Sequence, residues 1–192
     1  AKDYSPDGRV LAIARVDLAK DDADILMLER PAGPEPWTMT PYLTSAAAED
    51  PLAFSPDGRW VRFVSAESGR SELYVQRYTG PGSGADDARA GRAQVSTAGC
   101  SWLSWWSADL EEIRYVDADE QVMSVKITTE PSFSASLPQA LYSIKELNAA
   151  LVTFAPDGSL MVALPGENEE VTKIDLVVNF LDEMREKAAP AK

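Results

Sequence analysis

Short apolar segments alternate with clusters of turn-forming residues along the whole chain. The clearest pair is Arg59–Ser65 and Glu72–Tyr78, which are separated by the turn residues 67–70, Glu-Ser-Gly-Arg. Short segments rich in Val, Ile, Leu, Tyr and Phe and bounded by turn residues are typical of β-strands. The same pattern predicts strands at Val10–Val16, Ile25–Arg30, Ile113–Val116, Val122–Ile127, Leu160–Leu164 and Val171–Val178. Weaker strands are expected near Met39–Leu43, Ala93–Ser96 and Ala140–Ile144, each after a polar or Pro/Gly-rich loop.

A short phrase recurs before each group of strands. It reads Tyr-Ser-Pro-Asp-Gly-Arg at 4–9 and Phe-Ser-Pro-Asp-Gly-Arg at 54–59. It is degraded to Trp-Ser-Ala-Asp-Leu at 106–110 and returns as Phe-Ala-Pro-Asp-Gly-Ser at 154–159. The aspartates of the four copies, Asp7, Asp57, Asp109 and Asp157, lie 48 to 52 residues apart. A fixed period of this size indicates a repeat architecture.

The phrase has the chemistry of a tight hairpin turn. Proline presets φ at the second turn position, aspartate bonds nearby backbone groups, and glycine accepts the left-handed conformation that closes a type I turn with a bulge. The structural turn residues are therefore Pro6, Asp7, Gly8, Pro56, Asp57, Gly58, Pro156, Asp157 and Gly158. In the third copy Ala108 replaces the proline and Leu110 the glycine. Because a side chain at positive φ is strained, we expect that turn to be looser or of another type.

Four antiparallel strands in about fifty residues, repeated along the chain, predict an all-β fold of the β-propeller kind. About four blades are present, at approximately 1–48, 49–98, 99–147 and 148–178, and the first and last are incomplete. A short C-terminal helix is expected at 179–189, because Asn179 is a plausible N-cap and Phe180, Met184 and Ala188 share one face.

The repeat resembles that of the TolB-like β-propeller family. The similarity rests on Ser-Pro-Asp-Gly-Arg, a strand, a Ser-Gly turn and Glu-Leu-Tyr-Val, best seen from Phe54 to Tyr78. The tail, Val171–Val178 followed by Asn-Phe-Leu-Asp-Glu, is similar to the closing segment of C-terminal propellers of bacterial serine/threonine protein kinases. The resemblance implies a periplasmic or extracytoplasmic location, although nothing in the sequence itself establishes the compartment.

The incomplete first and last blades leave three explanations open. The chain is part of a larger propeller, it closes through a second copy of itself, or it is an open crescent with covered ends. Unpaired strand edges are prone to pair with another chain. Self-association through open blade edges is therefore a possible interaction.

Composition narrows the classes of partner. The net charge is −13, which would repel a phosphate backbone, so nucleic acid is not an expected partner. No apolar run approaches the roughly 20 residues of a spanning helix, so this chain is not expected to insert into a membrane. Cys100 is the single cysteine, which excludes an internal disulfide.

No catalytic constellation, metal site or cofactor site is predicted. The sequence contains no histidine, which removes Ser-His-Asp and Cys-His arrangements. Asp17, Asp21, Asp22 and Asp24 lack EF-hand spacing, and a solvated turn explains them better. The glycine-rich stretch 80–84 has no phosphate-loop lysine, and Glu111 and Glu112 are expected to point to opposite faces of a strand.

The one feature that suggests binding is the cluster of Trp102, Trp105 and Trp106 on the expected inner strand of the third unit. Strand alternation puts Trp102 and Trp106 on one face and Trp105, with Leu103, on the other. Packing between blades is the plainer explanation. The alternative is that one or more line the channel mouth and anchor a ligand or peptide.

Together these observations predict a non-catalytic protein- or ligand-binding propeller module, a sensor or interaction domain of a larger protein. A protein or peptide is the expected partner. The alternative is an accessory propeller domain of a serine peptidase or other enzyme whose catalytic residues lie outside this chain.

Overall fold

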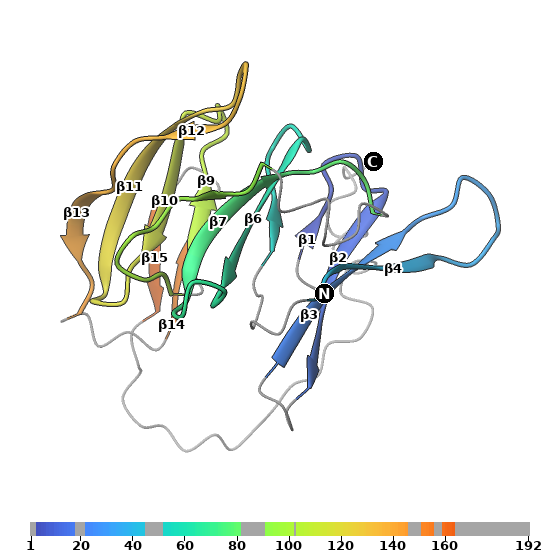
Figure 1. Cartoon of the computed structure of the whole chain (residues 1–192), viewed down its shortest axis with the longest axis horizontal. Coiled ribbons are helices and arrows are strands. Elements are labelled where there is room, and N and C mark those ends of the chain that lie inside the picture. The colour runs from blue at the N-terminus through green and yellow to red at the C-terminus, as the bar shows by residue number, and fades with distance from the viewer. Residues whose placement is uncertain are drawn as a thin grey trace, which may run out of the picture.

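The computed structural model describes residues 3–17, 22–44, 52–81, 91–101, 103–145, 151–155 and 159–163. Within these ranges the chain forms fifteen β-strands, arranged in four antiparallel sheets, and no helix (Figure 1). The all-β, blade-like architecture expected from the sequence is confirmed. The expected helix at 179–189 and the strand Val171–Val178 lie outside the described residues.

The first two sheets each have four strands in chain order. The first sheet contains β1 (Asp3–Tyr4), β2 (Val10–Asp17), β3 (Asp22–Glu29) and β4 (Thr38–Leu43). The second contains β5 (Ala53–Phe54), β6 (Trp60–Ser65), β7 (Glu72–Arg77) and β8 (Ala93–Gln94). The innermost strand of each sheet is short, and it pairs with the strand that follows the recurring turn.

The third sheet departs from the four-strand pattern at its outer edge. It contains β9 (Ser104–Trp106), β10 (Glu112–Val116), β11 (Gln121–Thr128), β12 (Ser134–Ala135) and β13 (Gln139–Ser143). Both β12 and β13 pair with β11, so two short segments share the place of one outer strand. The fourth sheet is described as β14 (Leu151–Phe154) paired with β15 (Leu160–Ala163).

The first three sheets pack face to face, and the apolar core lies between them. One cluster joins the first and second sheets and includes Met27, Tyr42, Val61 and Phe63. A second joins the second and third sheets and includes Trp60, Leu73, Trp106 and Ile113. Figure 1 shows the blue, teal and yellow sheets following one another in this order. This stacking of twisted antiparallel sheets is the packing of propeller blades.

The recurring turn has the same hydrogen bonds in its first two copies. Gly8 and Gly58 have φ of 69° and 71°, and their amides donate to the carbonyl oxygens of Ser5 and Ser55 at 2.8 and 2.9 Å. The hydroxyl of Ser55 donates to Asp57 at 2.6 Å and accepts the amide of Trp60 at 3.0 Å. The Ser5 hydroxyl makes the equivalent two bonds with Asp7 and Val10. Each serine thus fastens the turn to the first residue of the next strand.

The third turn corrects the sequence-based expectation of a looser or different turn. Leu110 adopts φ of 59°, and its amide donates to the Ser107 carbonyl at 3.1 Å, as the glycines do. The Ser107 hydroxyl accepts the amide of Glu112 at 2.9 Å, and Asp109 accepts that of Glu111 at 3.1 Å. Leu110 packs against the second apolar cluster. That packing offsets the strain of a side chain at positive φ, which is of the order of 1 kcal/mol or more.

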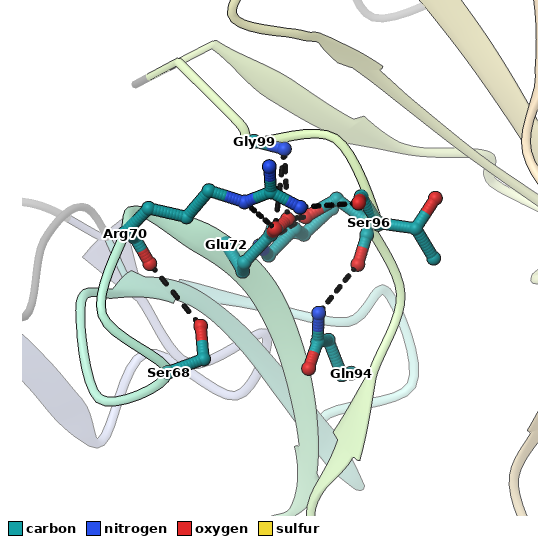
Figure 2. Close-up of polar contacts among 8 residues, drawn as sticks. Ser68, Arg70, Glu72, Gln94, Ser96 and Gly99 are labelled. Atoms are coloured by element: carbon teal, nitrogen blue, oxygen red, sulfur yellow. Dashed lines mark hydrogen bonds and ion pairs between the residues drawn. The ribbon is translucent and has the colours of Figure 1, made fainter.

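A buried carboxylate joins the second sheet to the segment that leads into the third (Figure 2). Glu72, at the start of β7, is 1% exposed and accepts the Ser96 hydroxyl, the Gly99 amide and the Arg70 side chain. Ser96 also accepts the Leu73 amide at 2.7 Å. Buried charges are normally paired and hydrogen-bonded, and Glu72 is both. Directly after this cluster, Cys100 is buried between the second and third sheets.

Candidate binding hollow at the inner strands

Strand register places three residues at equivalent positions on the inner strands. Asp3 is opposite Ala12, Ala53 is opposite Arg62, and Trp105 is opposite Arg114. Asp3, Ala53 and Trp105 therefore occupy the same position in successive sheets. All three line one open hollow of about 520 Å³.

The hollow combines aromatic surface with a few polar groups. Its lining includes Tyr4, Phe54, Arg62, Ser104 and Trp105, together with Asp3. Tyr4 is 54% exposed and Trp105 is half-buried, so both present ring surface to a ligand. Concave sites that mix apolar surface with a few convergent polar groups are the usual form of a ligand site.

The predicted tryptophans have different positions. Trp106 is 6% exposed and belongs to the core cluster between the second and third sheets, although its edge also borders the hollow. Trp105 points to the other face of the strand, where its ring lies 6.3 Å from that of Phe154 in β14. Trp102 lies outside the described residues. Of the two that are described, only Trp105 offers a substantial surface for a partner.

Two further tryptophans lie away from the hollow's lining. Trp60 is 5% exposed in the core, and Trp37, in the segment between β3 and β4, is 43% exposed. The exposed Trp37 is thus a natural control for any test of Trp105.

Arg62 was not singled out by the sequence analysis, yet it lines the hollow. It lies in the middle of β6, is 9% exposed, and reaches across to the inner strand of the third sheet. Its Nη1 donates to the Ser104 hydroxyl, and its Nη2 donates to the Ser104 carbonyl oxygen at 2.6 Å. The Nε of Arg62 is buried without a hydrogen-bond partner. The sequence feature that could have identified Arg62 is its charge inside the apolar run Trp-Val-Arg-Phe-Val of 60–64.

The electrostatics of Arg62 are those of a cation removed from water. Burial lowers its pKa to about 10, while the charge of Asp3 acts in the opposite direction. Asp3 uses its two carboxylate oxygens for backbone amides, those of Tyr4 at 2.9 Å and Phe54 at 2.8 Å. No ion pair joins Arg62 to a carboxylate among the described residues.

The other candidate groups show no catalytic geometry. Glu112 pairs with Arg114 at 3.0 Å, and Asp24 pairs with Arg15. Asp21 and the side chains of Asp17 and Asp22 lie outside the described part of the chain. In that part, no group of three Asp, Glu, Cys or His side chains is arranged to hold a metal ion. Nor does the described part contain a helix long and apolar enough to cross a membrane.

Comparison with known proteins gives a fold but no sequence family. No family model matches the sequence, and no curated protein sequence matches it. Among solved structures, TolB from Acinetobacter baumannii matches with a TM-score of 0.50 and 15% identity, over 82% of this chain and 35% of that chain. A protein assigned as a TolB from Agrobacterium tumefaciens matches with a TM-score of 0.51 and 16% identity, over 84% of this chain and 56% of that one.

These likenesses show that the chain has a TolB-like propeller fold. The chain spans about a third of one matched structure and just over half of the other. The four described sheets therefore correspond to a part of those longer propellers.

Proposed function

We propose that this chain is a non-catalytic binding module that recognises a protein or peptide partner in the hollow at its inner strands. The observation that carries the proposal is the convergence of Tyr4, Arg62 and Trp105, from three different sheets, on one open hollow of about 520 Å³. The TolB-like propeller fold is consistent with a binding role.

Trp105 is the expected anchor. A partly exposed tryptophan can bury a large rigid surface at low entropic cost, and such residues dominate the energy of many interfaces. Its ring is held by the Arg114 guanidinium, which lies 5.4 Å from the ring centroid, and by Phe154 on the next sheet. This support pre-organises the ring for a partner.

The proposal is tested by selecting short random peptides, displayed with a free C-terminus, for binding to the immobilised chain. Affinities of enriched peptides are then measured on purified wild type, Trp105→Ala and Trp37→Ala. Loss of Trp105 is expected to weaken binding by about 2 kcal/mol, roughly 30-fold. Loss of Trp37 removes the same indole ring from an exposed position outside the hollow and should leave the affinity unchanged.

Two outcomes would contradict the proposal. One is that no peptide is enriched above a blank surface. The other is that Trp105→Ala and Trp37→Ala bind every enriched peptide equally well.

The parent protein is part of the same proposal. We place the module in a larger protein, as a sensor or interaction domain similar to the propellers carried by bacterial serine/threonine kinases, and in an extracytoplasmic compartment. The limited span of the chain against the matched structures supports the larger parent. The neighbouring coding sequence tests it: an upstream kinase domain supports the sensor role, and a downstream hydrolase with a Gly-x-Ser-x-Gly motif supports an accessory domain of a peptidase.

We also propose self-association, which the sequence suggested through open blade edges and which an exposed face of the first sheet supports as well. On the first sheet, Tyr4 and Met39 are 54% and 61% exposed, and they continue one row with Leu11 and Leu28. An exposed apolar row across a sheet is a surface that another sheet can cover. Light scattering on a sizing column across a dilution series distinguishes a dimer, which supports this contact, from a monomer, which rejects it.

A further inference from the structure

We infer that the hollow recognises a carboxylate of its peptide partner, and that Arg62 is the group that binds it. This inference rests on the proposed function, because it names the chemistry of a ligand for the same site. It concerns Arg62 of this chain, which neither the fold nor the structural comparisons single out.

The first argument is the count of hydrogen-bond donors. A guanidinium carries five N–H groups in a fixed planar fork. Arg62 uses one N–H on the Ser104 hydroxyl and one on the Ser104 carbonyl oxygen. The remaining three have no partner among the described residues. Because the Nε is wholly enclosed, the second N–H groups of Nη1 and Nη2 are the donors that a ligand in the hollow would use. Buried N–H groups without hydrogen-bond partners are rare in native proteins, and the binding of a ligand is one explanation for them.

The second argument is charge. A buried cation is normally paired, because removal from water costs far more than any neutral contact returns. Asp3 is the acid whose charge acts on Arg62, but no ion pair joins the two among the described residues, and the oxygens of Asp3 accept the backbone amides of Tyr4 and Phe54. A ligand carboxylate in the hollow would supply the missing counter-charge, and carboxylates match the guanidinium fork in shape.

The third argument is an internal comparison with Arg114, which occupies the same position in the next sheet. Two residues before Arg114 is Glu112, which forms an ion pair with it at 3.0 Å, and Ser124 stands opposite on β11. Two residues before Arg62 is Trp60, and opposite it on β7 is Val75. Arg114 therefore has a carboxylate partner in its own strand, whereas Arg62 has apolar neighbours and lines an open hollow.

A competing explanation is that Arg62 is only a tether between the second and third sheets. Its two bonds to Ser104 would serve that role. A tether predicts that Arg62 variants change stability alone. Carboxylate recognition predicts in addition that a peptide whose carboxylate is neutralised binds the wild-type protein more weakly. This affinity difference is measured without any substitution in the protein.

The experiment uses the peptides enriched in the selection described above. For each peptide, twins are made in which the terminal carboxylate is amidated or an acidic side chain is changed to its amide. Affinities are measured on wild type, Arg62→Gln, Arg62→Lys and Arg15→Gln. Arg15 is a matched control for lost charge, because its side chain is 64% exposed and pairs with Asp24 away from the hollow.

On the wild type, one neutral twin should bind at least about tenfold more weakly than its parent, and that twin identifies which carboxylate is recognised. The difference should vanish in Arg62→Gln, persist in Arg15→Gln, and return in part in Arg62→Lys. Circular dichroism melts establish which variants are folded. If Arg62→Gln does not fold, the twins on the wild type still decide whether a carboxylate is recognised, and Arg62→Lys decides whether this arginine recognises it.

The outcomes separate the two proposals. If no peptide depends on Trp105, the proposed function itself fails. If Trp105-dependent peptides bind equally with and without their carboxylates, the function stands and the carboxylate inference is overturned. The inference is also overturned if the preference for the carboxylate is undiminished in folded Arg62 variants.

Discussion

The second and third sheets begin with the same turn, but their strands bury different amounts of side chain. All six residues of β6 are buried, whereas in β10 Glu112 and Arg114 are half-buried and Ile113, Tyr115 and Val116 are buried. The second sheet lies between two apolar clusters, and the third contributes to one of them. The two sheets share one turn motif but bury their strands to different extents, so the turn alone does not determine how apolar the strands are.

The largest expected difference between the two sheets concerns their strand interiors. Phe63→Ala removes a fully buried ring from β6 and should lower the free energy of unfolding by about 3–5 kcal/mol. Arg114→Ala, at a half-buried position of β10 with a charged partner, should cost about 1 kcal/mol or less. Chemical denaturation followed by circular dichroism compares the two. Equal losses would show that the two sheets are not buried as differently as their side chains indicate.

The next effect concerns the glycine of the second turn. Gly58→Val places a β-branched side chain at φ of 71° and should destabilise the chain by roughly 1–3 kcal/mol. A Cβ at Gly58 would also lie 3.3 Å from Cδ of Pro6, whereas a Cβ at Gly8 would meet nothing within 4 Å.

Gly8→Val is the matched control, because it has almost the same φ without the contact. It should lose less stability than Gly58→Val in the same thermal melt. A wild-type melting temperature for Gly58→Val would mean that the turn assignment is wrong.

A smaller effect tests whether the third turn is as well formed as the second. Ser55→Ala and Ser107→Ala each remove a hydroxyl that accepts the first amide of the following strand. Each should cost about 1 kcal/mol, because a buried or partly buried N–H loses its partner. If the third turn were loose, Ser107→Ala would leave the free energy of unfolding measured by chemical denaturation unchanged, whereas Ser55→Ala would lower it.

The smallest effect is a dependence of stability on acid. Burial opposes ionisation of Asp57, but the bonds from Ser55 and Arg59 outweigh it and lower the pKa. The bond from Ser107 and the amide of Glu111 likewise lower the pKa of Asp109.

A carboxyl with a lowered folded pKa stabilises the fold above its unfolded pKa, near 3.9, and this stabilisation is lost as pH falls through the folded value. Asp57→Asn and Asp109→Asn should each flatten the fall in melting temperature below about pH 4. A melting curve as acid-sensitive as that of the wild type would show that the carboxyl contributes nothing to the turn.

The strands and turns follow from local chemistry, so the sequence predicts them well. Proline, glycine and the serine–aspartate pair encode the first two turns within six residues, and β-branched runs mark the strands. The fourth copy of the turn, with Pro156, Asp157 and Gly158, lies outside the described residues. Local rules failed at Leu110, because its packing against residues distant in sequence outweighs the strain of its backbone. They also missed the division of the third outer strand into β12 and β13, which depends on pairing with β11.

The hollow was only partly predictable. Strand alternation placed Trp105 and Trp106 on opposite faces, which the structure confirms by burying Trp106 and leaving Trp105 half-buried. The contact of Arg62 with Ser104 spans 42 residues and joins two sheets, so no local pattern identifies Ser104 as the partner. An arginine in an apolar strand is the sign that a longer-range partner must exist.

The reactivity of the Cys100 thiol reports on the contact between the second and third sheets. Burial raises the pKa of its thiol to about 12, so the reactive thiolate is scarce while the sheets are in contact. Separation of the sheets would expose the sulfur to water and restore ordinary reactivity. The rate at which a thiol reagent modifies this single cysteine therefore measures how often two neighbouring blades part, a motion that neither melting nor binding experiments resolve.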